Sequence, residues 1–567
     1  MKEDRNHLCI LVALAINVFY LIICFAFCGK PYFGAVDDYF MARTLEGVFG
    51  DSYNVHLTFV NVLYGYFLLP FYHLFPKIGW YYIGEIAEVF VSFSIISFVL
   101  IKKMGMRWGI VLSLLFTLFF ARDFYLTVQF TLCAAILGAS GMLLSLYGIG
   151  VQQHKKRIVL LGILLMLWSA IMRREAFLMG VPFFICTLLL QIKDGYYSKH
   201  FLFITILILL TGLCGIEKVN QLHYTSPEYH NYMEFQTPRA TLGDKSNYDK
   251  KLVCDELEEE GFYCEDYNLL ANWTFYDTEI FAIDSLKKIA KKIEKNTYPI
   301  KWLSLPSILL NAIDQSANKP GLWAFSFFCS LIFLSKKGKI TYVWTAFLIM
   351  IILMAYLLYL HRFVYHVESG LWLYATTLSI PFIDKFRKPS KQLFTCLFFI
   401  LIVAISSLFL CSGAFIRSVH SGILFDSSPI SKNLPKYRAL FEYVQSSSDC
   451  TLFLTDMKTY KLFNYYKESP YLSEPVGSWK KIIPLGFWTP YFPDIANHLK
   501  KCGITNPIRE IISNNMLAIN EYRLSDFLER HYYDSVSVQI VKEFENIKIF
   551  KYTKIDIDKD ENKETEH

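Results

Sequence analysis

Two adjacent carboxylates follow the first apolar run of the chain. The stretch PYFGAVDDYFMARTLEGVFG, residues 31–50, places Asp37 and Asp38 at the start of a segment with a helical pattern. There they could cap the helix, because a carboxylate accepts the free backbone N–H groups of the first turn and suits the helix dipole. They could also hold a divalent cation, or one could act as a general base near neutral pH. By itself, the pair is best explained as a cap.

Charged side chains also gather in three short polar segments between apolar runs, FFARDFY, SAIMRREAF and YLHRFVYH. Taken one at a time, they are explained as turn pairs, interfacial salt bridges or ligands of lipid headgroups. Taken together, they suit a phosphate-bearing substrate in the membrane, since guanidinium groups bind phosphate through paired hydrogen bonds. With one histidine of the first loop added, the candidate set is His56, Arg122, Asp123, Arg173, Arg174, Glu175, His361 and Arg362.

The composition is that of a membrane protein. Hydrophobic residues make up 54% of the 567 residues and charged residues only 19%, whereas soluble domains carry roughly 25% charged residues. Runs such as 8–27 and 393–411 reach the roughly 20 apolar residues that cross a bilayer. The net charge of +6 comes from basic clusters confined to short loops, so we expect membrane lipids as partners and no nucleic acid.

These basic clusters set the expected topology, because cytoplasmic loops are rich in Lys and Arg. We predict an all-α polytopic fold of about 11 transmembrane helices in a bacterial plasma membrane, with the N-terminus cytoplasmic and the C-terminus outside. The basic clusters fall on the cytoplasmic side only if residues 57–75 do not cross the membrane. The polar residues of this stretch suit a helix that lies in the outer interface. The predicted spans are 8–28, 80–101, 108–121, 125–149, 158–171, 177–191, 201–217, 321–335, 340–360, 367–383 and 391–416.

This topology places the large polar regions outside the cell. The transmembrane domain, residues 1–416, contains two outer loops at 29–79 and 218–320. Residues 417–555 mix helix-like and strand-like patterns and are long enough for a small α/β domain. The charged tail 556–567 is expected to be disordered. The four cysteines outside the spans permit two disulfides, for which Cys254–Cys264 and Cys450–Cys502 are the candidate pairs. A zinc site is the weaker alternative, because no CxxC motif or nearby histidine pair accompanies them.

The spans themselves are nearly free of ionisable groups. Glu85 and Glu88 lie toward the outer end of their helix, and no Asp, Lys or Arg falls at an expected bilayer midplane. Ion-coupled transporters usually carry such groups as relays. The pattern therefore disfavours a transporter and favours chemistry at the outer face.

With these features in place, the chain resembles the polyprenyl-phosphate-dependent glycosyltransferases of the GT-C superfamily, including its protein mannosyltransferase and aminoarabinose transferase branches. The motif AVDDYFMARTLEG is similar to the acidic-pair opening of their first outer loop, and residues 56–80 resemble the interfacial helix that follows. More narrowly, DDYFMARTLEG, MRREAF, TPRATLGD and HRFVYH resemble a recurring pattern in a group of bacterial polytopic membrane proteins. The pair is Asp-Asp rather than the commoner Asp-Glu, and a WWDYG-type motif is absent, which disfavours an oligosaccharyltransferase.

The resemblance implies an inverting transfer of a sugar from a polyprenyl-phosphate-linked donor to a cell-envelope glycan or lipid acceptor on the outer face. It implies a carboxylate base on the acceptor hydroxyl, for which Asp37 is the candidate. Asp38 would orient Asp37, or share with it a divalent cation such as Mg²⁺ or Mn²⁺, and Asp123 is a third candidate ligand.

The remaining candidates would hold the substrates. The leaving phosphate needs cationic stabilisation, for which the candidates are Arg173, Arg174 and Arg362. In the large loop, aromatic and charged side chains suit a sugar ring, and the candidates there are Arg239, Trp273 and Asp277.

Two other classes stay open. An O-antigen-type glycan polymerase or ligase would centre its catalysis on loop arginines and would not need Asp37. A non-enzymatic carrier or flippase of lipid-linked glycans would need charged residues along a path through the bilayer, which the spans lack.

Overall fold

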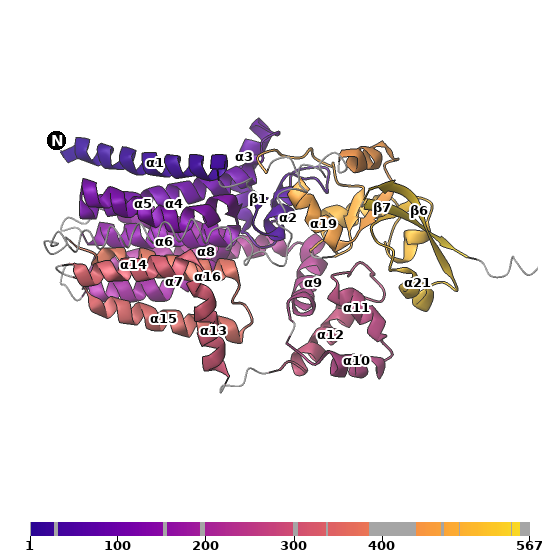
Figure 1. Ribbon diagram of the computed structural model, residues 1–567. Coiled ribbons are helices and arrows are strands. Elements are labelled where there is room, and N and C mark those ends of the chain that lie inside the picture. Colours follow the sequence, from indigo (N-terminus) through magenta and orange to yellow (C-terminus); the bar gives the residue numbers. More distant parts are fainter. Residues whose placement is uncertain are drawn as a thin grey trace, which may run out of the picture.

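In the computed structural model, a bundle of long helices carries its extramembrane parts at one end (Figure 1). The structure describes residues 2–27, 32–150, 156–192, 199–245, 247–298, 304–335, 338–384, 438–466, 470–486, 488–545 and 547–555. The predicted span 391–416, the domain boundary after residue 416 and the tail 556–567 lie outside these ranges. The number of spans therefore stays a prediction.

Long apolar helices form the bundle, which confirms the predicted polytopic helical fold. Two shorter apolar helices complete it, α14 (Pro320–Leu334) and α16 (Tyr365–Thr377), the latter followed by the 3₁₀-helix η1 (Ile380–Phe382). Within the described residues, seven helices are long and apolar enough to cross a membrane: α1 (Lys2–Phe27), α4 (Trp80–Met104), α5 (Met106–Leu126), α6 (Phe130–Ile149), α7 (Lys156–Ile192), α8 (Lys199–Tyr224) and α15 (Ile340–Tyr359).

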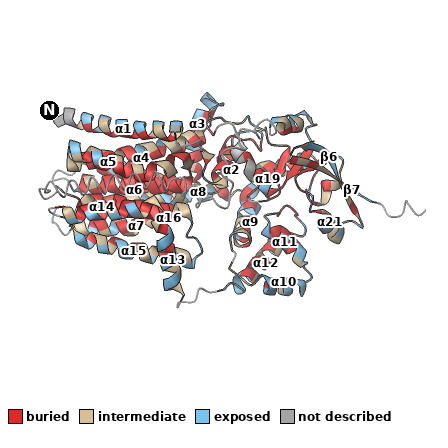
Figure 2. Cartoon of the chain, viewed as in Figure 1, coloured by how far each residue is buried: buried red, intermediate tan, exposed pale blue. Residues whose placement is uncertain are grey.

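Helix α6 runs through the interior of the bundle and is buried along almost its whole length (Figure 2). Small residues allow its neighbours to approach closely, as is common between membrane helices. Gly141 of α6 lies against the backbone of Gly162 in α7, and Gly148 lies against Val159. Because the later residue of α6 meets the earlier residue of α7, the first half of α7 runs antiparallel to α6.

Helix α7 is a hairpin rather than one straight rod. Its backbone leaves the helical region at Arg173, where φ is −162° and ψ is 111°. Ser169 in the first half and Gly180 in the second both lie beside the Tyr374 side chain, although a straight helix would separate them by about 16 Å along its axis. The chain thus reverses at Arg173, as expected for two spans joined by the MRREAF turn.

The first outer loop folds against the end of the bundle. Strand β1 (Tyr32–Phe33) pairs in parallel with β2 (Thr127–Val128), and α2 (Val36–Leu45) follows β1 closely. Helix α3 (Val62–Leu74) has 13 residues, which is too short to cross a bilayer. It buries Tyr64 and Tyr72 and exposes Phe67 and Leu74. An exposed apolar side on a short helix fits the prediction that this segment lies in the interface.

Five helices follow in the large outer loop: α9 (Pro227–Asp244), α10 (Lys250–Glu258), α11 (Cys264–Ala271), α12 (Ile283–Lys295) and α13 (Leu305–Ala317). The Cys254–Cys264 disulfide joins α10 to the start of α11. Buried Leu286, Ile289 and Ile293 line one side of α12 at helical spacing, so this part of the loop has a small apolar core of its own.

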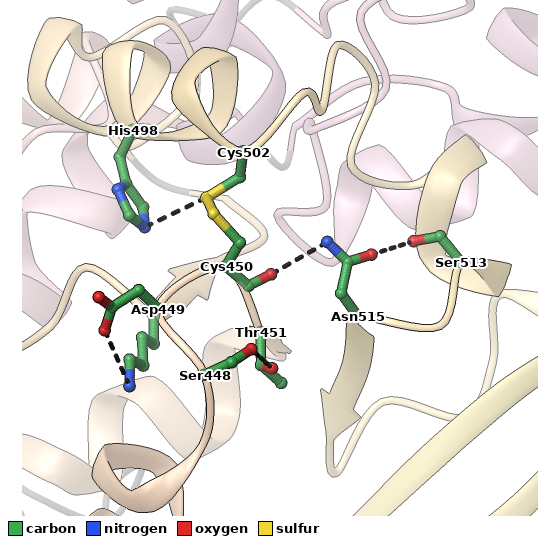
Figure 3. The surroundings of a disulfide bond; sticks show 9 residues. Ser448, Asp449, Cys450, Thr451, His498, Cys502, Ser513 and Asn515 are labelled. Atoms are coloured by element: carbon green, nitrogen blue, oxygen red, sulfur yellow. Dashed lines mark hydrogen bonds and ion pairs between the residues drawn. A yellow bond between two sulfur atoms is a disulfide. The ribbon is translucent and has the colours of Figure 1, made fainter.

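The C-terminal region is an α/β unit, as predicted. Its sheet has five described strands in the order β4-β3-β5-β7-β6. Strand β3 pairs in parallel with β4 and β5, whereas β7 pairs antiparallel with β5 and with β6. The Cys450–Cys502 disulfide links the turn before β3 to the end of α20, and Asn515 donates to the Cys450 carbonyl at 3.0 Å (Figure 3). The elements are β3 (Leu452–Thr455), α19 (Met457–Tyr466), β4 (Ile482–Pro484), α20 (Pro493–Lys501), η2 (Arg509–Ile512), β5 (Met516–Ile519), α21 (Ser525–His531), β6 (Val536–Phe544) and β7 (Ile547–Lys554).

Candidate functional site

The two aspartates lie in the first turn of α2, directly after β1. The helix begins at Val36 and its N-cap residue is Ala35, which provides no side-chain cap. Asp37 is therefore not the N-cap that the sequence pattern favours. Both carboxylates still lie where the helix dipole stabilises negative charge. Successive helical residues point about 100° apart, so the two side chains face different surroundings.

Asp38 points inward and is fully buried. Its Oδ1 accepts hydrogen bonds from the Tyr81 hydroxyl and from the backbone N–H of Phe130, both at 3.1 Å. Phe130 is the first residue of α6, so Asp38 provides the cap that α6 lacks from its own chain segment. The aspartate thereby joins α2, α4 and α6 at one point, a role that its position in the sequence does not suggest.

A second carboxyl group faces Asp38 from α4. Asp38 Oδ2 and both oxygens of Glu85 are buried and find no donor among the described residues, yet the two side chains interact directly. Two acceptors that face one another need a proton between them, because like charges at such a distance cannot both persist in a buried site. Burial raises the pKa of Asp38 to about 8. We therefore assign one shared proton to the Asp38–Glu85 pair at neutral pH.

One turn further along α4, Glu88 Oε1 accepts from Trp168 Nε1 at 2.6 Å. Buried carboxyl groups in an apolar helix are a signal for a site, and the sequence contains that signal at Glu85 and Glu88. Their connection to Asp38 could not be predicted, because it depends on how α2 packs against α4.

Asp37 is the more accessible of the pair, since its side chain is only partly buried. A general base must reach the proton that it removes. Of the two aspartates, Asp37 has the exposure for that contact, whereas Asp38 is held inside by Tyr81, Phe130 and Glu85.

Arg173, at the turn of the α7 hairpin, contacts the same Phe130 that binds Asp38. Its guanidinium carbon lies 4.7 Å from the centre of the Phe130 ring, and the N–H of the same Phe130 binds Asp38. A cation over an aromatic face is stabilised by the ring quadrupole. The side chain is 31% exposed, so it reaches the surface beside the aspartates. His366 of α16 lies close enough to be affected by its charge.

The neighbouring Arg174 faces elsewhere. Its side chain is 56% exposed and forms ion pairs with Glu175 and with Glu217 of α8, each at 3.3 Å. Arg173 Nε also lies 3.9 Å from Glu175, so both arginines of the MRREAF turn contact that carboxylate. They differ in their other partners, since Arg173 lies over the Phe130 ring and Arg174 pairs with Glu217.

Asp123 and Arg122 lie at the end of α5, on the same side of the bundle. Asp123 accepts a hydrogen bond from the Tyr365 hydroxyl, and Arg122 and Lys319 both affect its charge state. Lys319 in turn pairs with buried Glu368. The sequence pattern includes Arg122 and Asp123 but not Lys319 and Glu368, which come together only when α14 and α16 pack.

His56 belongs to a cluster that holds the start of α9. Its ring stacks on Tyr229 with centroids 4.0 Å apart, and Nδ1 lies 2.9 Å from Asn54 Oδ1. Burial lowers the pKa of His56 to about 4. A histidine that is neutral at pH 7 offers no positive charge to a phosphate group, so the surroundings of His56 favour a structural role.

The large-loop candidates divide into two groups. Arg239 is buried, with its guanidinium 5.9 Å from the Trp273 ring and 6.0 Å from the Trp488 ring. Trp488 contacts Phe59, which stacks on Phe130. An aromatic chain thus leads from Arg239 back to the surroundings of Arg173.

Asp277 lies apart from that chain. Both of its oxygens accept from Tyr532 of the C-terminal region, at 3.0 and 2.9 Å, and Oδ1 also binds the backbone N–H groups of residues 279 and 280. This buried carboxylate joins the large loop to the C-terminal region.

His361 and Arg362 form the exposed turn after α15, beside a cavity of about 540 Å³. The other walls come from α9 and from Lys245, Asn247, Thr297 and Tyr298. These two residues do not contact Asp38, but the turn leads within four residues to His366, beside Arg173.

The divalent cation predicted at Asp37, Asp38 and Asp123 stays a prediction. Among the described residues, no group of three or more His, Cys, Asp or Glu side chains is arranged to hold a metal ion. Asp38 is engaged with Glu85 and Asp123 with Tyr365. We therefore derive no step that passes through a metal.

A scan against protein-family models finds no match, and a search of curated proteins finds none either. Among solved structures, the chain is similar to ArnT from Cupriavidus metallidurans in the apo state, with 10% sequence identity and a TM-score of 0.41 over 96% of this chain and 97% of that one. It is also similar to ArnT from the same organism bound to undecaprenyl phosphate, with 12% identity and a TM-score of 0.40 over the same shares. At these TM-scores the likeness adds no weight to the role of any residue.

The Asp38–Glu85 pair predicts a pH-dependent stability. The unfolded chain loses the Asp38 proton near pH 4, whereas the folded chain keeps it to about pH 8. The native state binds more protons across that window, so stability falls as the pH rises from 4 to 8. Asp38→Asn should flatten this fall, because the amide oxygen still accepts from Tyr81 and Phe130 while its N–H₂ group donates to Glu85.

The measurement is the melting temperature of the detergent-purified protein at pH 5 and pH 8. Asp38→Ala serves as a control, since it leaves two buried donors without an acceptor and should destabilise the protein at both pH values. Equal pH slopes for the wild type and Asp38→Asn would contradict the shared proton.

Proposed function

We propose that the chain is a GT-C-type membrane glycosyltransferase that moves a sugar from a polyprenyl-phosphate donor to a hydroxyl of a cell-envelope glycan or lipid. The observation that carries the proposal is that the aspartate turn and Arg173 meet across Phe130 at one end of an apolar bundle. A base beside a phosphate-binding cation at the end of membrane helices suits a lipid-phosphate donor, whose chain stays in the bilayer while its sugar lies outside.

Asp37 takes the acceptor O–H proton as the acceptor oxygen attacks the anomeric carbon of the donor. The new C–O bond forms on the face opposite the phosphate, and the old C–O bond breaks with its electron pair going to the lipid phosphate. Configuration at that carbon is inverted. Arg173 stabilises the charge that develops on the leaving phosphate, because a guanidinium group can donate two hydrogen bonds to it. Asp38 fixes the start of α2 and thereby orients Asp37.

The two neighbouring arginines provide a matched test of this proposal. Arg173→Ala should weaken binding of a radiolabelled polyprenyl phosphate to the purified protein by about 10- to 100-fold, the loss expected for charge-assisted hydrogen bonds of about 1.5–3 kcal/mol. Arg173→Lys should fall between Arg173→Ala and the wild type, because an ammonium group is a point charge without the planar fork.

Arg174→Ala is the control for the same turn. Its exposed ion pairs with Glu175 and Glu217 contribute little, so lipid-phosphate binding should match that of the wild type. Equal binding by both alanine variants would place the donor phosphate elsewhere and count against the proposed function.

A further inference from the structure

A cavity of about 540 Å³ lies between the large outer loop and the turn after α15. This size falls within the range of small-molecule sites, about 300–1,000 Å³. Among the described residues, its wall contains three basic side chains, Lys245, His361 and Arg362, and no Asp or Glu.

The wall combines the groups that a charged saccharide needs. Lys245 and Arg362 can bind an anionic group, while the threonine hydroxyls and the Asn247 amide oxygen suit sugar hydroxyls. Tyr298 and Tyr359 add aromatic surface. Two carboxylates lie next to the wall: Lys245 is 3.8 Å from the exposed side chain of Glu294, and the Tyr298 hydroxyl interacts with Asp249.

One group in the wall has an unused hydrogen-bond donor. Gln236 Oε1 accepts from Arg239 Nε at 3.0 Å, which fixes the orientation of the amide. Its Nε2 is buried and finds no acceptor among the described residues. A buried donor without a partner is destabilising unless something else satisfies it. An oxygen-rich ligand in the cavity beside it would provide acceptors where the protein provides none.

The far wall is held in an unusual conformation. His361 has a φ of +55°, which is rare for a residue with a side chain and is found mainly where the surroundings enforce it. Its Nε2 lies 2.7 Å from the Asn247 amide nitrogen, so a hydrogen bond joins the turn to the large loop across the cavity.

The same turn leads to the donor site. Four residues after Arg362, His366 lies close enough to Arg173 to be affected by its charge, and between them Tyr365 donates to Asp123. We propose that this cavity is the acceptor subsite and binds a sugar that carries a phosphate or other anionic group. The proposal rests on the proposed function, because it places this group beside a donor phosphate held by Arg173.

The test uses glucose 6-phosphate as the probe, with glucose and inorganic phosphate as its two halves, and measures binding to the full-length protein in detergent. Wild type should bind glucose 6-phosphate at least about ten-fold more tightly than either half. Lys245→Gln combined with Arg362→Gln should lose that preference. Lys287→Gln combined with Arg509→Gln removes the same two residue types at ion pairs outside the cavity and should leave binding unchanged.

Binding of labelled polyprenyl phosphate separates this inference from the proposed function. The cavity double variant should bind it like the wild type, whereas Arg173→Ala should not. If the cavity variant keeps full glucose 6-phosphate binding while Arg173→Ala loses the lipid phosphate, the acceptor subsite is wrong and the proposed function stands. If Arg173→Ala binds the lipid phosphate normally, the proposed function is wrong, and the acceptor assignment that rests on it is wrong as well.

A lipid headgroup could supply the same phosphate chemistry. Competition by dihexanoyl phosphatidylglycerol as strong as that by glucose 6-phosphate would assign the cavity to a lipid headgroup and overturn the acceptor proposal. Failure of the short-chain lipid to compete would support a saccharide ligand.

Discussion

Replacing Asp37 with Asn is expected to lower the rate of sugar transfer by about 10²- to 10⁴-fold, the usual contribution of a general base. The amide has nearly the same shape but cannot accept the acceptor proton. The fold should survive, because Asp37 is only partly buried and the aspartate that joins α2, α4 and α6 is Asp38. The measurement is surface glycan in the native host, scored against the amount of folded protein in the membrane.

Asp51→Asn is the matched control in the same outer loop. Asp51 is an exposed carboxylate whose partners are Lys480 and Lys501 of the C-terminal region. The two lysines hold the pKa of Asp51 down at about 2, so it is ionised at neutral pH as a general base would be. Its loss should leave transfer unchanged, because exposed ion pairs contribute little.

Normal glycan made by Asp37→Asn at normal protein levels would remove Asp37 from the mechanism. The remaining classes would then be a glycan polymerase or ligase that works through loop arginines, or a carrier without chemistry. Arg173→Ala would distinguish these two, since loss of glycan in that variant alone points to arginine-centred catalysis.

Much of the architecture could be predicted from periodicity and charge. The apolar runs predict the long helices, and polar residues within 57–75 exclude a span where the structure has the short helix α3. The MRREAF turn predicts a reversal, and the chain does reverse at Arg173. Each of these features depends on residues that are close in sequence.

The site itself could be predicted only in outline. The aspartate pair is visible in the sequence, but which aspartate is buried depends on the position at which α2 begins. The helix begins two residues earlier than it would if Asp37 were its N-cap. Nothing in the sequence distinguishes Arg173 from Arg174. The packing of α7 places Arg173 over Phe130 and Arg174 beside Glu217. Glu85 joins the site through a contact with a residue 47 positions earlier, which no local pattern encodes.

The second large effect is on stability and concerns Arg43 in α2. This arginine is fully buried and pairs with Glu46 through two contacts of 2.8 Å and with Glu474 of the C-terminal region at 3.4 Å. The Glu474 backbone N–H in turn donates to Glu46 at 3.0 Å. The network therefore fastens the C-terminal region to the helix that carries the aspartates.

Arg43→Met should destabilise the protein by about 3–5 kcal/mol, because removal of one partner leaves carboxylates buried without a counter-charge. Combining Arg43→Met with Glu46→Gln should recover part of that loss, since the combination removes the stranded charge. If the two side chains contributed only through packing, the losses of stability from the two single substitutions would add in the double variant. Lys480→Met, which breaks the exposed pair with Asp51, should change the stability little, because exposed ion pairs contribute little.

Thermal unfolding in detergent, followed by limited proteolysis of the C-terminal region, measures both parts of this prediction. In Arg43→Met the C-terminal region should become protease-sensitive below the temperature at which the helical bundle unfolds, because the lost contacts lie between the two. Sugar transfer should fall in parallel with that loosening, since α2 holds Asp37 at one end and Arg43 at the other. If Arg43→Met unfolds like the wild type, the buried pair is not what holds α2 to the C-terminal region, and the position of Asp37 must depend on Asp38 alone.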